Sequence, residues 1–323
     1  MLLNRRGALG LAALAAAPKP SGPQTKAPPD PHEIIRLWPG AAPGGATVTV
    51  TPRVVERSTD PAFHDRFAQY TTDPILTVLR PDRPNGASLL LIPGGGYRWA
   101  VVDKEGLDCA RPFAAAGVTC FILRYRLPAD GWAAGPAAPL QDAQRAMRLV
   151  RRTAMAEGLD PQRVAVLGAS AGGHLAGALT AGKDAVYEAT DEADALPFRP
   201  DLSILMYPVA TMEGPFVHAG SRQHLLGPDP SPDAVARWSL ERMDWTGAPP
   251  TFLLHAMDDD SVPVENSLQL LAAIRAAGVK AEAHLFEEGG HGFGIRLIAG
   301  RPASIWPQLV LAWAARRGWT APA

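Results

Sequence analysis

The chain has 323 residues, of which 47% are hydrophobic and 20% are charged, and its formal net charge at pH 7 is −1. This composition is that of a globular protein with a large buried core, and the balanced charge gives no reason to expect binding to nucleic acid or to a membrane surface. The sequence contains no histidine and cysteine spacing typical of a zinc site, so we expect neither a metal nor another cofactor.

The N-terminal segment has the pattern of a bacterial export signal. Arg5 and Arg6 precede an alanine-rich apolar stretch that is too short to span a bilayer stably. A twin arginine before such a stretch is typical of twin-arginine export, and Ala13-Leu14-Ala15 offers a cleavage site. We therefore expect residues 1–17 to be an export signal, residues 18–32 to be an extended proline-rich linker, and the protein to be periplasmic or secreted. A disordered cytoplasmic tail is the alternative.

Residues 33–320 are expected to form a single domain of the α/β class. After a turn-rich region, short apolar runs alternate with amphipathic stretches. This alternation predicts right-handed crossovers and a mostly parallel central sheet with helices on both faces. The runs that predict strands are residues 75–79, 88–92, 118–123, 163–167, 202–206, 251–256 and 281–286.

Two of the predicted helices are marked clearly in the sequence. One carries apolar residues spaced by three and four positions, which places them on one helical face: Leu140, Ala143, Met147, Val150 and Ala154. The other has Pro263 in its first turn, carries Val264, Leu268 and Leu271, and stops at Gly278.

Two features leave alternatives open. The irregular segment 209–248 is either a small cap over the carboxyl edge of the sheet, where ligands of such sheets bind, or an ordinary surface excursion. The two cysteines, Cys109 and Cys120, fall in a predicted helix and in the strand after it. A disulfide between them is conceivable, but two separately buried thiols are favoured.

A Gly-x-Ser-x-Gly pattern centred on Ser170 follows the predicted strand 163–167. It is typical of a nucleophile elbow, in which a serine stands on a sharp turn between a strand and a helix. The glycines are needed because a side chain two residues before or after the serine would collide with its neighbours. Ser170 is therefore the candidate nucleophile of an acyl-transfer reaction.

The serine needs a base, and the base needs an orienting acid; in hydrolases with this elbow both follow later in the chain. Three consecutive carboxylates, Asp258, Asp259 and Asp260, come after the predicted strand 251–256. We select Asp259 because it lies four residues after His255, as in a common His-Gly-x-x-Asp pattern. The flanking aspartates are then loop residues, one of which could cap the following helix.

His291 is the candidate base. It lies in a glycine-rich loop after the last predicted strand, and it is the only one of the eight histidines in that register. His255 and His284 fall in strands, whereas His218 and His224 lie outside the expected position. His174 would lie on the helix that follows Ser170, where we expect it to support the site rather than act as the base.

Backbone amides are expected to stabilise the tetrahedral oxyanion. Ala171 begins the helix after the serine, where the helix dipole favours negative charge. The glycine run Pro93-Gly94-Gly95-Gly96-Tyr97 follows the predicted strand 88–92, and read alone it would be a flexible turn. Its position favours an oxyanion loop, with the amides of Gly95 and Gly96 as donors alongside that of Ala171.

These motifs resemble the α/β-hydrolase superfamily, in particular serine esterases with His-Gly-Gly-Gly oxyanion loops. The chain is similar to a group of bacterial secreted carbohydrate esterases, often called acetylxylan esterase-like, over roughly residues 34–318. Pro93 replaces the loop histidine of the broader esterase pattern, and Ala169 is smaller than the residue often found before the serine. The shared runs are residues 93–97, 125–128, 139–146 and 170–176.

The resemblance implies a serine carboxylesterase that removes acetyl groups from xylan-derived saccharides. The residues themselves support an esterase for a small acyl group, with a small-molecule or oligosaccharide ester as its partner. A serine peptidase of the prolyl-oligopeptidase type shares the fold and the order of the catalytic residues and is the alternative. A non-catalytic binding protein of this fold would normally have lost one of Ser170, Asp259 and His291, and all three are present.

Overall fold

The structure, a computed structural model, describes residues 26–320. The expected export signal, residues 1–17, and the first part of the expected linker lie outside the described residues. Residues 26–32 contain no helix or strand, and the carboxylate of Asp30 pairs with Arg66 at 2.6 Å. None of the helices in residues 26–320 has the length and apolar character that a membrane span requires.

An eight-stranded sheet forms the centre of the molecule, with the strand order β1-β4-β6-β5-β7-β8-β9-β10. The neighbours from β6 to β10 pair in parallel, whereas β1 and β4 pair antiparallel at one edge. The predicted mostly parallel sheet is confirmed. Two further strands, β2 and β3, form a separate antiparallel pair. The strands are β1 Ile34–Arg36, β2 Arg53–Glu56, β3 Arg66–Gln69, β4 Ile75–Leu79, β5 Ser88–Ile92, β6 Thr119–Arg124, β7 Val164–Ala169, β8 Leu202–Met206, β9 Thr251–Ala256 and β10 Ala281–Phe286.

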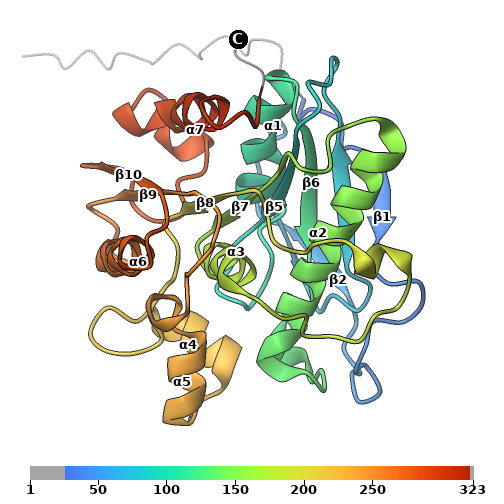
Figure 1. The fold of residues 1–323 in the computed structure, drawn as a ribbon, viewed down its shortest axis with the longest axis vertical. Coiled ribbons are helices and arrows are strands. Elements are labelled where there is room, and N and C mark those ends of the chain that lie inside the picture. Colours follow the sequence, from blue (N-terminus) through green and yellow to red (C-terminus); the bar gives the residue numbers. More distant parts are fainter. Residues whose placement is uncertain (1–25, 321–323) are drawn as a thin grey trace, which may run out of the picture.

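Helices cover both faces of the sheet (Figure 1). Side chains alternate between the faces of a strand, so Leu90 and Ile92 of β5 join one core and Leu89 and Leu91 join the other. The first core is covered by α2, α3 and α6, and the second by α1 and α7. The helices are α1 Asp108–Ala115, α2 Ala138–Glu157, α3 Ala171–Ala181, α4 Ala219–Leu226, α5 Pro232–Trp238, α6 Glu265–Ala276 and α7 Trp306–Ala315.

The predicted elements agree closely with the observed ones. The bounds of β4, β5, β8, β9 and β10 are those predicted, and β7 extends two residues further, to Ala169. The apolar stripe of α2 is buried as expected. The second marked helix, α6, begins at Glu265, and Leu268 is 42% exposed because Leu270 and Ile274 form the buried face.

The segment 209–248 contains α4 and α5, and Figure 1 shows these helices beyond α3 and α6, away from the sheet. Asn266 of α6 holds the start of this segment. Its side-chain oxygen accepts hydrogen bonds from the amides of Ala210 at 2.9 Å and Thr211 at 3.2 Å, and its side-chain nitrogen donates to Phe216 at 2.8 Å. A buried polar side chain on a core helix therefore sets the path of an irregular segment.

Both cysteines are buried free thiols, as favoured from the sequence. Burial raises the pKa of both Cys109 and Cys120, because an apolar environment disfavours the charged thiolate. Neither thiol is therefore activated as a nucleophile.

Candidate active site

The candidate residues lie at the carboxyl edge of the sheet. Ser170 follows β7, Asp259 follows β9 and His291 follows β10, while the glycine loop that contains Gly95 and Gly96 follows β5. Parallel strands end at a common edge, so residues far apart in the sequence meet there. The structure brings together all three residues that the sequence analysis selected.

Ser170 occupies a strained turn between β7 and α3. Its backbone has φ 55° and ψ −122°, a region that residues with a side chain rarely adopt, and its side chain is almost buried. A Cβ atom on Gly168 would lie 2.2 Å from the carbonyl oxygen of Gly172, and one on Gly172 would lie 2.1 Å from that of Ile92. The steric reason expected for the two glycines therefore holds in the structure.

A continuous hydrogen-bonded path leads from Ser170 to Asp259. The hydroxyl of Ser170 lies 2.8 Å from Nε2 of His291, and Nδ1 of His291 lies 2.7 Å from Oδ2 of Asp259. If Nδ1–H donates to the carboxylate, Nε2 keeps its lone pair and accepts the hydroxyl proton of Ser170. The geometry therefore suits proton transfer from the serine to the histidine.

The Asp259 carboxylate has donors on both oxygens. Oδ1 accepts from the amides of Ser261 at 3.0 Å and Val262 at 2.8 Å, and Oδ2 also lies 3.1 Å from Nε2 of His255. Burial raises the pKa of Asp259, but the hydrogen bonds from His255 and His291 outweigh it and hold the pKa below its ordinary value. Asp259 is thus fixed as a carboxylate beside His291.

Asp258 has a role that the sequence analysis did not assign. Neither it nor Asp260 caps α6: the residue before that helix is Val264, with no capping side-chain hydrogen bond. Instead, Oδ1 of Asp258 accepts from the amides of Gly289 at 2.9 Å and Gly290 at 2.8 Å. The expected cap is therefore wrong, because the carboxylate is used to hold the loop that carries His291.

The glycine loop is held at its first peptide bond. The carbonyl of Pro93 accepts from the Tyr125 hydroxyl at 2.8 Å, and the amide of Gly94 donates to the buried carboxylate of Glu105 at 3.0 Å. The two following glycines have positive φ values, 128° at Gly95 and 63° at Gly96. Hydrogen bonds within residues 26–320 outside regular elements use none of the amides of Gly95, Gly96 and Ala171. Gly95 and Gly96 line the cavity described below, so their amides are available to a ligand there.

Glu105 also links the glycine loop to the histidine loop. Its second oxygen accepts from the hydroxyl of Tyr207 at 3.2 Å, and that hydroxyl accepts from the amide of Gly294 at 3.2 Å. The Tyr207 ring also packs edge-on against His291, with 5.2 Å between ring centres. Glu105 lies in a π-helical turn, Asp103–Leu107, that precedes α1. Sequence reasoning missed Glu105 and Tyr207, because no motif marks them.

His174 supports the site, as expected. It is fully buried, with Nδ1 2.7 Å from the Tyr97 hydroxyl and Nε2 2.7 Å from the carbonyl of Trp238. Burial lowers the pKa of His174 to about 4, although the Trp238 carbonyl acts in the opposite direction. A neutral imidazole therefore connects α3 to the end of the glycine loop and to the segment 209–248.

A cavity of about 290 Å³ opens beside Ser170 and His291. Gly95, Gly96 and Trp99 form part of its wall, and His218 and His224 contribute from the segment 209–248. His218 stacks on His291 with 6.5 Å between ring centres and 17° between ring planes. Burial and the neighbouring His291 lower the pKa of His218 below its ordinary value. The sequence analysis did not select His218 and His224, because they lie in an irregular segment whose position relative to the sheet cannot be predicted from the sequence.

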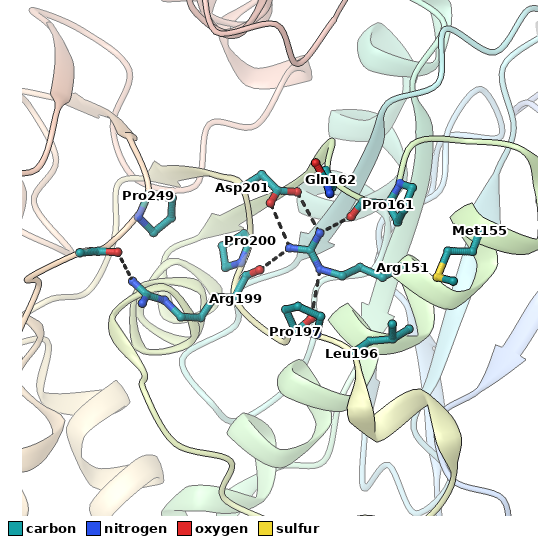
Figure 2. Close-up of a pocket in the computed structure, with 11 residues that line it drawn as sticks. Arg151, Met155, Pro161, Gln162, Leu196, Pro197, Arg199, Pro200, Asp201 and Pro249 are labelled. Atoms are coloured by element: carbon teal, nitrogen blue, oxygen red, sulfur yellow. Dashed lines mark hydrogen bonds and ion pairs between the residues drawn. The ribbon is translucent and has the colours of Figure 1, made fainter.

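A larger hollow, of about 570 Å³, lies around Arg151 (Figure 2). Its guanidinium group binds the Asp201 carboxylate and the carbonyl oxygens of Pro161, Pro197 and Arg199. The residues that line it include no serine, cysteine or histidine, and Arg151 is fully used in these contacts. The chemistry therefore points to the smaller cavity. Among residues 26–320 we find no group of histidine, cysteine and acidic side chains that could hold a metal ion.

Comparison with known proteins agrees with this fold. A family model described as the prolyl oligopeptidase family matches residues 138–316. A crystal structure of an acetyl ester-xyloside bifunctional hydrolase from Caldicellulosiruptor lactoaceticus is 31% identical, with a TM-score of 0.70. The superposition covers 93% of this chain and 100% of that one.

Two curated proteins are similar over part of their length. The chain is 34% identical over 221 residues to endo-1,4-beta-xylanase B from Butyrivibrio fibrisolvens, covering 68% of this chain and 34% of that protein. It is 31% identical over 218 residues to the acetylxylan esterase from Xylanibacter ruminicola, covering 66% of this chain and 42% of that protein. The chain thus spans between a third and a half of these relatives. The similarities confirm the expected α/β-hydrolase fold, and the similar proteins include an acetylxylan esterase and a probable carboxylic ester hydrolase.

Proposed function

The chain belongs to the prolyl oligopeptidase family, whose model matches residues 138–316, and from this premise we propose that it is a serine esterase that removes acetyl groups from saccharides. The observation that carries the proposal is the path of hydrogen bonds from Ser170 through His291 to Asp259 at the wall of an open cavity. Such a path is what activates a serine hydroxyl as a nucleophile at neutral pH.

In the proposed reaction, the Ser170 oxygen attacks the ester carbonyl carbon while its proton moves to Nε2 of His291. The bond between the acyl carbon and the alcohol oxygen then breaks, and His291 gives the proton to the departing alcohol. Water next attacks the acyl-serine and loses a proton to His291. The acid is released as the proton returns to Ser170, so the enzyme ends each cycle unchanged.

The neighbouring groups would lower the barriers of both steps. The carboxylate of Asp259 stabilises His291 while the ring carries a positive charge, because Oδ2 lies 2.7 Å from Nδ1. The unused amides of Gly95, Gly96 and Ala171 would donate hydrogen bonds to the oxyanion. The strained backbone of Ser170 presents its hydroxyl at the start of α3, where the helix dipole adds to that stabilisation.

The size of the cavity and the named relatives support an acetyl saccharide as the substrate. A cavity of about 290 Å³ is near the lower end for ligand sites, which favours a short acyl group. The similar proteins include an acetylxylan esterase and an acetyl ester-xyloside hydrolase, and from these we extend the proposal to xylan-derived saccharides.

A peptidase of the same family is the competing function, since the fold and the order of the catalytic residues are shared. The named relatives that favour an ester substrate are an acetylxylan esterase, an ethyl acetate hydrolase and several esterases. A direct comparison of ester and amide substrates therefore separates the two functions.

The experiment measures kcat/KM for 4-nitrophenyl acetate, 4-nitrophenyl octanoate and a proline-containing peptide 4-nitroanilide, together with acetate release from acetylated xylo-oligosaccharides. We expect the acetate ester to be cleaved faster than the octanoate, the oligosaccharides to lose acetate, and the anilide to remain intact. A preference for octanoate would contradict the short acyl group. Cleavage of the anilide at a higher kcat/KM than any ester would contradict the esterase.

We also propose that the chain is exported to the periplasm or beyond, on the pattern around Arg5 and Arg6. In a bacterial host, the full chain should be found outside the cytoplasm, and the Arg5→Lys/Arg6→Lys variant should remain inside. Equal distribution of the two variants between the compartments would contradict this export route.

A further inference from the structure

The cavity beside Ser170 is lined by an excess of positive charge. Arg57, Arg98 and Lys104 are among its lining residues, and Glu105 is the acidic side chain among them. The three cations come from different parts of the chain, since Arg57 follows β2, Arg98 follows the glycine loop and Lys104 lies in the π-helical turn. The excess of positive charge at the cavity therefore arises because the fold brings three separate segments together, and not because one segment is rich in cations.

Among the described residues, Glu105 forms no ion pair with these cations. Its carboxylate is buried, and its two oxygens accept from the amide of Gly94 and the hydroxyl of Tyr207. Arg57 has a partner of its own, because its guanidinium binds the carboxylate of Asp65 at 2.9 Å. In the described part of the chain, Arg98 and Lys104 form no ion pair with a carboxylate.

These two unpaired cations lie beside different loops of the site. The backbone of Arg98 donates to the carbonyl of Gly95 at 3.1 Å, and its guanidinium lies 4.9 Å from the centre of the Trp99 ring. Arg98 thus extends from the glycine loop. A Cβ atom on Gly292 would lie 3.0 Å from Nζ of Lys104, so this ammonium group lies against the histidine loop.

A positive potential of this kind favours an anionic ligand. Arginine and lysine without carboxylate partners bind carboxylates through charge-assisted hydrogen bonds, and a cavity wall of low polarity strengthens the attraction. Trp99 adds an aromatic surface to the same wall, with Phe67 4.9 Å away and Arg57 5.4 Å from the Phe67 ring. These contacts connect the aromatic side chains with Arg57 and Arg98 beside the cavity.

We propose that the substrate is an acetyl ester of an acidic saccharide, in which a carboxylate on the alcohol part, as in a uronic acid, is bound by Arg98 and Lys104. The inference rests on the proposed function. An acetyl group is neutral, so a negative charge on the substrate must lie on the alcohol part. It goes beyond that function in distinguishing acidic from neutral saccharide esters.

The test uses two acetyl esters that differ in one charge, 4-acetoxybenzoate and its methyl ester, at low ionic strength. The measured quantity is the ratio of kcat/KM for the anionic ester to kcat/KM for the neutral one. Since each ester is compared with itself across variants, their different intrinsic reactivities cancel. We expect the Arg98→Gln/Lys104→Gln variant to lower this ratio about tenfold, mainly through a higher KM for the anionic ester.

The matched control is Arg275→Gln/Lys280→Gln, which removes two exposed cations that do not line the cavity. It should keep the wild-type ratio. In the wild type, raising the salt concentration to about 0.5 M should lower the ratio as well, because salt screens the attraction. The salt series needs no variant, so it tests the inference even if the double variant folds poorly.

Two results would overturn the inference. One is an unchanged ratio in the double variant, including equal losses for both esters, which would assign the cations to a step that both substrates share. The other is a wild-type ratio that does not fall as salt is added. Absence of hydrolysis of either ester by the wild type would instead contradict the proposed esterase itself. The two failures are therefore distinguishable.

Discussion

The carboxylate of Glu105 accepts a hydrogen bond from the amide of Gly94 at 3.0 Å, and this contact ties the start of the glycine loop to a buried acid. The other oxygen of Glu105 binds Tyr207, whose hydroxyl reaches the amide of Gly294. One side chain thereby joins the loop that presents Gly95 and Gly96 to the loop that carries His291. The relative position of the two loops depends on it.

Glu105→Gln should reduce esterase activity without unfolding the protein. A glutamine offers one acceptor oxygen and one donor group, so it cannot accept from both Gly94 and Tyr207. We expect kcat for 4-nitrophenyl acetate to fall about tenfold, with little change in KM. Glu157→Gln is the matched control, because that carboxylate pairs with Arg80 at the surface. A loss confined to KM, or a similar loss in the control, would contradict the positioning role of Glu105.

Replacing each of two adjacent aspartates should separate their roles. Asp259→Asn removes the charge beside Nδ1 of His291, and we expect kcat to fall by about 10³–10⁴. Asp258→Asn keeps one oxygen that can accept from Gly289 and Gly290, and its loss should be at most about tenfold. Steady-state kinetics with 4-nitrophenyl acetate gives both values. Comparable losses would show that Asp259 is not the orienting acid.

His174 should make the stability of the protein depend on pH. The pKa of His174 is lowered in the folded state to about 4, below its ordinary value of 6.5. Between these values the unfolded chain binds a proton that the folded chain does not, so the free energy of unfolding falls as the pH falls from 6.5 towards 4. The expected loss between pH 7 and pH 5 is about 2 kcal/mol.

The His174→Gln variant is the comparison for this prediction. Glutamine can accept from the Tyr97 hydroxyl and donate to the Trp238 carbonyl, but it does not titrate in this range. Urea unfolding at pH 7 and pH 5 should show a smaller pH dependence in the variant than in the wild type. Identical pH dependence in the two proteins would mean that His174 carries no such linkage.

Gly172→Ala should destabilise the fold at the elbow. The added Cβ would lie 2.1 Å from the carbonyl oxygen of Ile92, so the backbone of β5 or α3 must move. We expect the free energy of unfolding to fall by roughly 3 kcal/mol, with loss of activity. Gly40→Ala is the control, since nothing lies within 4 Å of its added Cβ. Equal stability of the two variants would contradict the steric account of the elbow.

The sequence was sufficient to predict the central strands and the three candidate catalytic residues. Strands buried on both faces appear as continuous apolar runs, and for that reason β5, β8 and β9 have the predicted bounds. Ser170 was selected because the glycines on either side of it are required by the close packing of a nucleophile elbow. Asp259 and His291 were selected because each follows a predicted strand of a parallel sheet. These signals are local, or follow from strand order alone.

The supporting contacts could not be predicted in the same way. Glu105 reaches Gly94 and Tyr207 only through a π-helical turn and two loops, and no spacing in the chain indicates that path. His218 reaches His291 because Asn266 holds the start of its irregular segment. The apolar pattern also failed to predict which face of α6 is buried, since Leu268 is exposed. The contacts of Glu105 and His218 depend on long-range packing of polar side chains, and the exposure of Leu268 depends on the buried face that Leu270 and Ile274 form.

The most direct test of the central claim is covalent labelling of Ser170. The full chain is treated with diethyl 4-nitrophenyl phosphate, residual activity on 4-nitrophenyl acetate is followed, and the modified residue is located by peptide mass spectrometry. We predict one phosphoryl group per chain, on Ser170, in proportion to the activity lost, and a folded Ser170→Ala variant with neither label nor turnover. A label on another residue, or turnover that survives in Ser170→Ala, would contradict the proposed mechanism.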